Sequence, residues 1–132
     1  MTETAGYSGT PLPKKLGLKP GSRLLVLNGP EDFYQRLEQE PENVPLYDVI
    51  VLFVLSRAQL ENEFEKATER LAERGGLWIA WPKRASKVPT DVTEQLLRDV
   101  ILPTGFVDNK VCAIDEVWSG LRFVRRLNRS NG

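Results

Sequence analysis

The sequence feature that most constrains the fold is a nearly unbroken apolar run at residues 47–55, which only Asp48 interrupts. A strand with one face in water alternates apolar and polar residues, whereas a strand covered on both faces is apolar throughout. The run is far too short to cross a bilayer. We therefore expect it to form a central strand of a parallel sheet that has helices on both sides.

Signals for strands and helices alternate along the rest of the chain. After an apolar run at 23–27, Asn28 and Pro30 favour a helix start, because Asn can cap a helix and Pro tolerates its first turn. The predicted elements are strands at 23–27, 47–55 and 77–81, helices from 28 to about 41, from 56 to about 74 and from 91 to 103, and hairpin strands at 105–114 and 118–126. This order predicts an α/β, three-layer, Rossmann-like and mostly parallel sheet with a C-terminal antiparallel hairpin.

Capping signals mark the ends of the two longer helices. Ser56 with Gln59, and Asp91 with Glu94, have the spacing of a capping box. A glycine pair at 75–76 is typical of a helix end. We therefore expect one helix to begin at Ser56 and stop before the glycines, and another to begin near Asp91.

The length of 132 residues fits a single domain. Gly and Pro residues recur throughout the beginning of the chain, so we expect an irregular N-terminal segment at 1–20. A single Rossmann-like α/β domain should follow at 21–127. We expect residues 128–132 to form a flexible tail, because chain ends without apolar anchors fray.

The absence of histidine removes His-based triads, His general bases and nearly every zinc or iron site. The single cysteine, Cys112, allows no internal disulfide, and its apolar neighbours predict a buried filler. Lys plus Arg equals Asp plus Glu at 18 each, so no overall field attracts nucleic acid or an anionic membrane. We expect a cytoplasmic protein without a metal, a cofactor, a nucleic-acid partner or a membrane partner.

Charge is nevertheless uneven along the chain. Residues 31–73 contain 11 acids and 4 bases, a net charge of −7, whereas residues 119–132 contain four arginines and no acid. One interpretation is that the acids keep exposed helix faces solvated. The other is a dipolar surface that self-associates or docks an acidic partner.

Polar residues follow several of the predicted strands. In open parallel sheets, ligands bind beyond the carboxyl ends of the strands, where loops and helix N-termini converge. The third predicted strand leads into a basic loop at 83–89, which also contains Arg84 and Lys87. The candidate ligand-binding residues at this edge are Lys83, Ser86, Thr90, Asp91, Lys110, Asp115, Trp118 and Ser119.

These residues suggest a site for a small anionic ligand or a protein partner. Lys83 and Lys110 would supply positive charge, Thr90 and Asp91 would present a helix N-terminus, and Trp118 would form an apolar wall. The alternative is that Thr90 or Asp91 only caps its helix and the lysines are solvated.

A second hypothesis is a small enzyme that works without histidine. Asp91 or Asp115 would act as the base and Lys83 as an electrostatic stabiliser. These groups would have to reach one pocket, and the hypothesis fails if Asp115 only closes the hairpin and Asp91 only caps a helix.

The order of strand, glycine-containing turn, helix, further strand–helix units and terminal hairpin resembles the class I S-adenosylmethionine-dependent methyltransferase fold. In that family the first loop is Gly-rich, so that the backbone can approach the cofactor. Here Gly29 is followed by Pro30, and residues 38–47 are too few for the strand–helix–strand portion that the family has at this point. The resemblance implies an abbreviated methyltransferase-like domain without methyltransferase activity, with a weak S-adenosylmethionine-binding regulator as the alternative.

The shortened connection also bears on assembly. It could leave one face of the sheet thinly covered, which would favour a homodimer. A monomer in which residues 1–20 cover that face is the competing solution. Residues 7–12 could in addition fold over the carboxyl edge as a lid.

Three separated polar motifs resemble a bacterial family known as domain of unknown function 3052. They lie at residues 6–12, at 81–94, and at 108–113 together with 118–123. The resemblance covers about 5–126 and implies a bacterial, single-domain, intracellular protein. It implies no activity.

Overall fold

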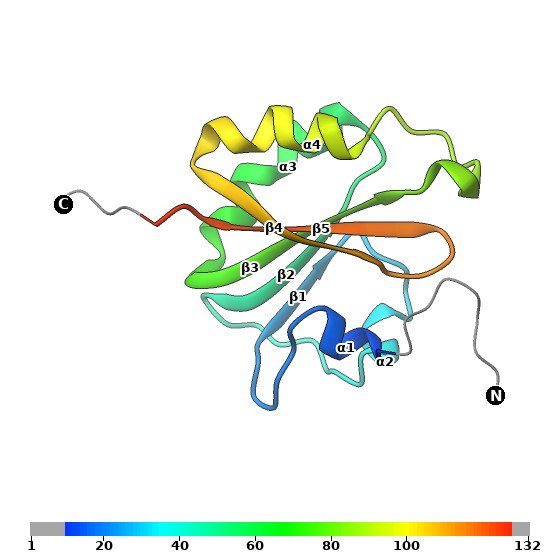
Figure 1. The fold of residues 1–132 in the computed structure, drawn as a ribbon. Helices are drawn as coiled ribbons and strands as arrows, with labels where there is room; N and C mark the ends of the chain where they lie inside the picture. The colour runs from blue at the N-terminus through cyan, green and yellow to red at the C-terminus, as the bar shows by residue number, and fades with distance from the viewer. Residues whose placement is uncertain (1–9, 128–132) are drawn as a thin grey trace.

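A computed structural model of the chain describes residues 10–127, which form a five-stranded sheet between two layers of helices (Figure 1). The strands are β1 (Leu24–Leu27), β2 (Tyr47–Phe53), β3 (Leu71–Pro82), β4 (Phe106–Ala113) and β5 (Trp118–Arg125). The helices α3 (Arg57–Glu69) and α4 (Glu94–Ile101) cover one face, and the short helices α1 (Leu12–Lys15) and α2 (Phe33–Arg36) cover the other. Single 3₁₀ turns lie at Arg84–Ser86 and Leu102–Thr104. The expected α/β three-layer architecture is confirmed.

The strand order is β1-β2-β3-β5-β4. β1 with β2 and β2 with β3 pair in parallel, whereas β5 pairs antiparallel with both β3 and β4. The terminal hairpin is therefore confirmed, but the sheet is parallel only in its first half, because the last strand inserts between β3 and β4. This places β1 and β4 at the two edges.

The sheet divides the core into two clusters. The α3/α4 cluster contains Leu60, Phe64, Leu97 and Ile101 from those helices, and the α1/α2 cluster contains Leu16, Phe33, Leu37, Phe53 and Trp78. Side chains at 49–53 on β2 alternate between the two clusters and are all buried. The apolar run thus forms a strand covered on both faces, as its composition predicts.

The helix expected to run to about Arg74 ends earlier, at Glu69, and β3 begins at Leu71. The glycine pair lies inside β3 instead of ending the helix. A Cβ on Gly76 would lie 2.7 Å from Cζ of Arg122, so this glycine lets the arginine side chain cross the strand. In this chain the glycine pair allows close packing within a strand. A Gly-Gly pair in the sequence does not by itself distinguish this role from a helix end.

Two of the three expected helix starts differ from the prediction. Ser56 caps α3 as expected, since its hydroxyl accepts a hydrogen bond from the N–H of Gln59 at 3.1 Å. α4 is capped by Thr93, whose hydroxyl accepts from the N–H of Leu96 at 3.0 Å, and not by Asp91. Asn28 caps nothing, because it adopts a left-handed conformation with φ 62° and α2 begins later, at Phe33.

The N-terminal segment packs on the α1/α2 face of the sheet. Leu16 is fully buried, and its carbonyl accepts a hydrogen bond from Nε1 of Trp78 at 3.1 Å. Residues 12–18 therefore cover the face that the short connection leaves thin, as the monomer alternative requires. Residues 1–9, and the expected tail at 128–132, lie outside the described residues. No helix within residues 10–127 is long and apolar enough to span a membrane.

A side chain closes the outer edge of β1. The N–H of Val26 points away from β2 and donates to the hydroxyl of Tyr34 at 2.9 Å. Tyr34 belongs to α2, so the short helix occupies the position at which a longer sheet would continue.

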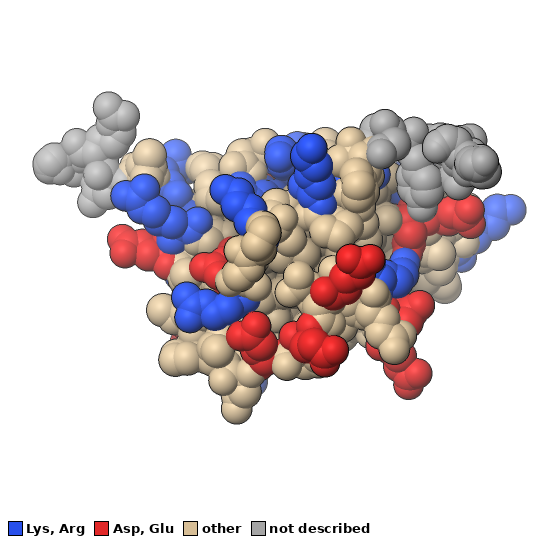
Figure 2. Space-filling view, turned by 90° about the horizontal axis from the view of Figure 1, so that it is seen from below, with Lys and Arg blue, Asp and Glu red and all other residues tan. Residues whose placement is uncertain are grey.

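Charges separate on the α1/α2 face. Figure 2, which looks at this face, shows Lys and Arg gathered along its upper margin and Asp and Glu mostly below them. Several of the acids flank α2 and the loop that follows it, whereas cations lie on α1 and β4. The uneven charge of the sequence therefore becomes an uneven surface.

Candidate functional site

The sheet separates the predicted site residues into two groups. Lys83, Thr90 and Ser119 line a cleft of about 580 Å³ on the α3/α4 side, where β3 ends and the loop to α4 begins. Lys110 lines a different groove, on the α1 side, and the ring of Trp118 packs in the α1/α2 cluster. The expectation that all of them share one rim is therefore wrong, because neighbouring residues on β5 point to opposite faces.

Three cations surround the cleft on the α3/α4 side. Lys83, Arg84 and Lys87 all line it, and none forms an ion pair with any residue in 10–127. The carboxylate that also lines the cleft, Glu94, is held at 2.6 Å by Nη2 of Arg98. The cleft therefore has a surplus of positive charge.

Lys87 also has an unusual backbone. Its φ of 63° lies in the left-handed region, at the end of the 3₁₀ turn, and its side chain is exposed. A side chain in that region costs roughly 1 kcal/mol relative to glycine. The lysine side chain therefore reaches solvent at the rim of the cleft.

Ser86, Thr90 and Asp91 shape the loop around the cleft. The Thr90 hydroxyl donates to the carbonyl of Leu55 at 2.6 Å, and a carboxylate oxygen of Asp91 accepts from the N–H of Arg57 at 2.9 Å. The Ser86 hydroxyl donates to the carbonyl of Lys83 at 2.7 Å. The bonds of Thr90 and Asp91 tie the loop to the start of α3, whereas the Ser86 bond lies within the loop, and neither Thr90 nor Asp91 caps α4.

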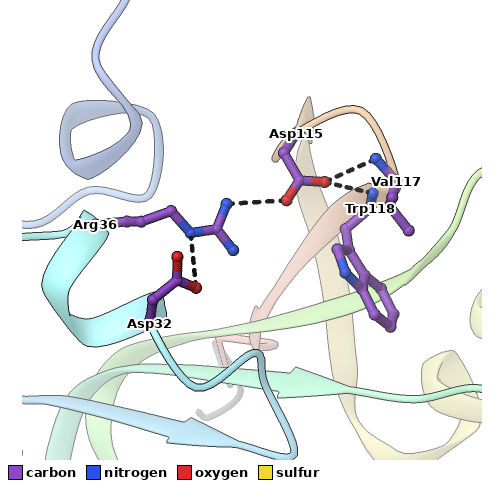
Figure 3. Close-up of polar contacts among 5 residues, drawn as sticks. All are labelled: Asp32, Arg36, Asp115, Val117 and Trp118. Atoms are coloured by element: carbon purple, nitrogen blue, oxygen red, sulfur yellow. Dashed lines mark hydrogen bonds and ion pairs between the residues drawn. The ribbon is translucent and has the colours of Figure 1, made fainter.

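Asp115 closes the hairpin (Figure 3). Its Oδ1 accepts from the N–H groups of Val117 and Trp118, both at 2.8 Å, and its Oδ2 accepts from Nη1 of Arg36 at 3.0 Å. Burial by itself raises the pKa of this carboxyl, but the hydrogen bonds from Trp118, Arg36 and Val117 together hold the pKa below its ordinary value.

These contacts do not support the roles that the enzyme hypothesis gives to Asp91 and Asp115. A general base works best with a pKa near the operating pH, and the pKa of Asp115 is displaced away from that range. Asp91 is engaged at the start of α3. Neither carboxylate lines the cleft that contains Lys83.

Trp118 contributes to packing rather than to a ligand wall in that cleft. Its ring meets the ring of Phe53 edge-on, with centroids 4.9 Å apart and an interplanar angle of 89°. Such edge-to-face pairs add stability beyond the area that they bury. The aromatic wall of the cleft is instead Trp81, which points to the α3/α4 side.

Lys110 meets the N-terminal segment in a second groove, of about 540 Å³, on the α1 side of β4. Thr10, Lys14, Lys15 and Cys112 also line it. Thr10, within the predicted lid, thus lies beside β4 and not at the β3–α4 cleft, and residues 7–9 fall outside the described part. Sequence reasoning missed this grouping, because no pattern in the sequence places α1 next to β4.

Cys112 is half-buried and packs against the α1/α2 cluster, close to its predicted role. Burial raises the pKa of its thiol, which Lys15 and Lys110 lower only in part. A thiol with a raised pKa is a poor nucleophile. Within the described part of the chain, no three acidic or cysteine side chains gather in a way that could hold a metal ion.

The turn after β1 does not fit S-adenosylmethionine, the cofactor that the methyltransferase resemblance implies. A Cβ on Gly29 would lie 2.7 Å from Cγ1 of Val26 and 2.9 Å from Cε1 of Phe53. The glycine therefore makes room for the chain's own Phe53 ring and opens no cradle for a ligand. The preceding Asn28 is held by Glu63, which accepts from its side-chain amide at 2.5 Å.

No protein-family model matches the chain, and no curated protein matches it. The resemblance to the bacterial family of unknown function is therefore not confirmed. Among solved structures, the chain is similar to a protein in the NADB-Rossmann superfamily from Streptococcus agalactiae, with 13% identity and a TM-score of 0.53, over 92% of this chain and 71% of that chain. This likeness shows a Rossmann-like fold and carries no function.

Two further solved structures have TM-scores below 0.5. A putative type 11 methyltransferase from Sulfolobus solfataricus has 12% identity and a TM-score of 0.49, over 92% of each chain. A fibrillarin pre-rRNA processing protein from Methanococcus jannaschii has 15% identity and a TM-score of 0.47, over 80% of this chain and 56% of that chain. The chain thus spans little more than half the length of that protein.

Proposed function

We propose that this chain is a non-catalytic, methyltransferase-like binding domain that takes a small anionic ligand in the β3–α4 cleft. The observation that carries the proposal is a set of three cations, Lys83, Arg84 and Lys87, that line one cleft at the carboxyl end of β3 and form no ion pair within residues 10–127. In Rossmann-like sheets, ligands bind beyond this end of the strands.

The dimensions and chemistry of the cleft suit a small molecule. A volume of about 580 Å³ lies within the range of small-molecule sites, which combine apolar walls with a few polar groups. Trp81 and Val92 supply apolar surface, and Ser119 supplies a hydroxyl. An anion with a flat or apolar portion would use both features.

Hydrogen bonds anchor the end of the loop that carries the cations. The hydroxyl of Thr90 and the carboxylate of Asp91 bind backbone groups at the end of β2 and the start of α3. A site on a fixed loop loses less conformational entropy on binding. Thr90 and Asp91 therefore act as supports of the site and not as ligand-binding groups.

An NMR titration with pyrophosphate at constant ionic strength tests the proposal. We expect saturable amide shifts confined to residues 83–94 and Ser119. Replacing Lys83, Arg84 and Lys87 together with glutamine should weaken binding about tenfold, because three exposed ion pairs of roughly 0.5 kcal/mol each sum to about 1.5 kcal/mol. Native mass spectrometry of the purified protein would identify any small molecule that copurifies.

A matched control separates a site from general charge attraction. Lys19, Lys66 and Arg74 form no side-chain hydrogen bond or ion pair with residues 10–127, and replacing them with glutamine removes the same charge elsewhere. The control variant should bind pyrophosphate with an affinity within about twofold of that of the unmodified protein. Equal weakening of both triple variants, or shifts scattered over all basic surfaces, would refute the proposal.

The remaining alternative is a weak S-adenosylmethionine-binding regulator. The contacts of Gly29 argue against it, because a phenylalanine ring fills the space at the first turn. Calorimetry with S-adenosylmethionine at millimolar concentration should give no heat of binding.

A further inference from the structure

The edge strand β4 exposes backbone on the side away from β5. The N–H of Ile114 donates to the carbonyl of Trp118, and in an antiparallel ladder such inward-pointing residues alternate with outward-pointing ones. Val111 and Ala113 therefore direct their backbone groups to the open edge. Nζ of Lys15 binds the carbonyl of Ala113 there, at 3.2 Å, which leaves the edge at Val111 open.

The side chain of Val111 is also open to solvent. It is 58% exposed and is one of the few large apolar residues on the described surface with so much exposure. A register shift between Asp108 and Lys110 interrupts the strand before it. The accessible part of the edge is thus a short stretch around Val111.

Cations line the face of this edge that lies towards α1. Lys14, Lys15 and Lys110 share the groove of about 540 Å³, and the basic margin of this face is visible in Figure 2. Arg122 stands directly opposite Lys110 in the β4–β5 ladder. Like charges opposite each other in a sheet destabilise it.

Three cations at this edge have no acidic partner among residues 10–127. Lys14, Lys110 and Arg122 form no ion pair with any residue in the described range, and the guanidinium of Arg122 reaches only the side-chain oxygen of Asn109, at 3.3 Å. Arg122 is half-buried, and Gly76 provides the space for its side chain. No acid within residues 10–127 therefore balances the charge of Lys14, Lys110 and Arg122.

We propose that an extended acidic peptide segment binds this groove as an added strand next to β4. Its backbone would pair with the N–H and carbonyl of Val111, and its carboxylates would meet the lysines. Side chains of a strand point alternately to opposite faces, so every second residue of the segment should be acidic. Binding of a peptide to a sheet edge takes its affinity from backbone hydrogen bonds and its specificity from alternate side chains.

A second copy of the chain is a poorer occupant. Pairing β4 with another β4 would bring the lysines of two copies together, and like charges at short range repel. A nucleic acid would satisfy the charge, but it has no strand backbone to pair with Val111. Only an acidic peptide satisfies both the charge and the edge.

Fluorescence anisotropy with a short blocked peptide that alternates serine and glutamate tests the inference. We expect binding to this peptide, none to the serine–glutamine version, and at least about fivefold weaker binding to a peptide of the same composition with its glutamates contiguous. Hydrogen exchange should show new protection of the Val111 amide when the alternating peptide binds. Equal binding of both glutamate peptides without that protection would overturn strand addition.

Variants separate the charge from the edge. Lys110→Glu should weaken binding at least about fivefold, and Lys66→Glu on α3 is its control. Val111→Pro removes the outward N–H, which the β4–β5 ladder does not use, and should weaken binding about tenfold, whereas Val111→Ala should not. Tighter binding of oligothymidylate than of the alternating peptide, or unchanged binding by both Lys110→Glu and Val111→Pro, would overturn the proposal.

The proposal of the β3–α4 cleft and the proposal of the β4 edge can be tested independently of each other. The glutamine variant of Lys83, Arg84 and Lys87 lies on the other face of the sheet, so it should bind the acidic peptide as the unmodified chain does. Lys110→Glu should in turn leave the pyrophosphate titration unchanged.

Discussion

Replacement of Asp115 with alanine should destabilise the fold, because this carboxylate joins the terminal hairpin to α2 (Figure 3). The substitution removes acceptors from two backbone N–H groups, those of Val117 and Trp118, and from the guanidinium of Arg36. The Asp115 side chain is only 21% exposed and that of Arg36 is 32% exposed, so solvent screens these bonds only in part.

The expected loss is about 2 to 3 kcal/mol in the free energy of unfolding. Hydrogen bonds to charged groups are worth roughly 1.5–3 kcal/mol when buried and less when partly exposed. Urea unfolding followed by tryptophan fluorescence measures the change, since Trp78 is buried and Trp118 adjoins the altered turn. Asp32→Ala is the control: Asp32 is 61% exposed and 3.5 Å from Arg36, so its loss should cost less than about 0.5 kcal/mol.

The destabilisation should depend on pH. The pKa of Asp115 is lower in the folded protein than in the unfolded chain, so its contribution is complete above the unfolded pKa, about 3.9. It is lost as the pH falls through the lower, folded pKa. The difference between the unmodified protein and Asp115→Ala should therefore be constant from pH 7 to about 5 and shrink below about pH 4.

Two results would refute this reasoning. A loss at pH 7 no larger than that of Asp32→Ala would mean that the three hydrogen bonds contribute nothing net. A loss that stays the same at pH 3 would mean that the carboxylate charge is not what stabilises the turn. A double-mutant cycle with Arg36→Met should give a coupling energy of about 0.5–1 kcal/mol between Arg36 and Asp115.

Two further substitutions address the local structure. Thr93→Ala should destabilise the protein by about 1 kcal/mol in urea unfolding, because Thr93 caps α4, and an unchanged midpoint would contradict that assignment. Gly29→Ala should cost about 1–3 kcal/mol, since its Cβ would clash with Val26 and Phe53. A thermal melt as high as that of the unmodified protein would mean that the turn has space that could admit a ligand.

The architecture was predictable where burial alone sets the pattern. The run at 47–55 is apolar because β2 is covered on both faces, and Ser56 with Gln59 marks the start of α3 through local hydrogen bonds. Both signals act within a few residues of the chain. They are therefore readable without knowledge of the tertiary fold.

The predictions from the sequence were wrong where a residue contacts a part of the chain that is far away in the sequence. The glycine pair at 75–76 resembles a helix end, yet Gly76 accommodates the side chain of Arg122 from β5. Asp91 has the spacing of a cap for α4, yet its carboxylate binds the N–H of Arg57. Such contacts depend on which strands and loops become neighbours, which spacing along the sequence does not encode.

The candidate site was predictable in part. The basic loop at 83–89 does lie at the carboxyl end of β3, and Lys83, Thr90 and Ser119 share a cleft there. Lys110 and Trp118 were assigned to the same edge, Lys110 as a source of positive charge and Trp118 as an apolar wall. Because side chains along β4 and β5 alternate between the two faces of the sheet, Lys110 and Trp118 lie on the α1/α2 face. There α1 contributes two further lysines, Lys14 and Lys15.

The hydroxyl of Tyr34 has a consequence for how this protein can associate. An unprotected edge strand can pair with the same strand of another copy, and such pairing can propagate into fibres. At β1 the exposed amide of Val26 is already satisfied by the phenol, so an incoming strand would first have to displace α2. Growth of the sheet in that direction therefore requires both the loss of this hydrogen bond and the displacement of α2, and Tyr34→Phe would remove only the hydrogen bond.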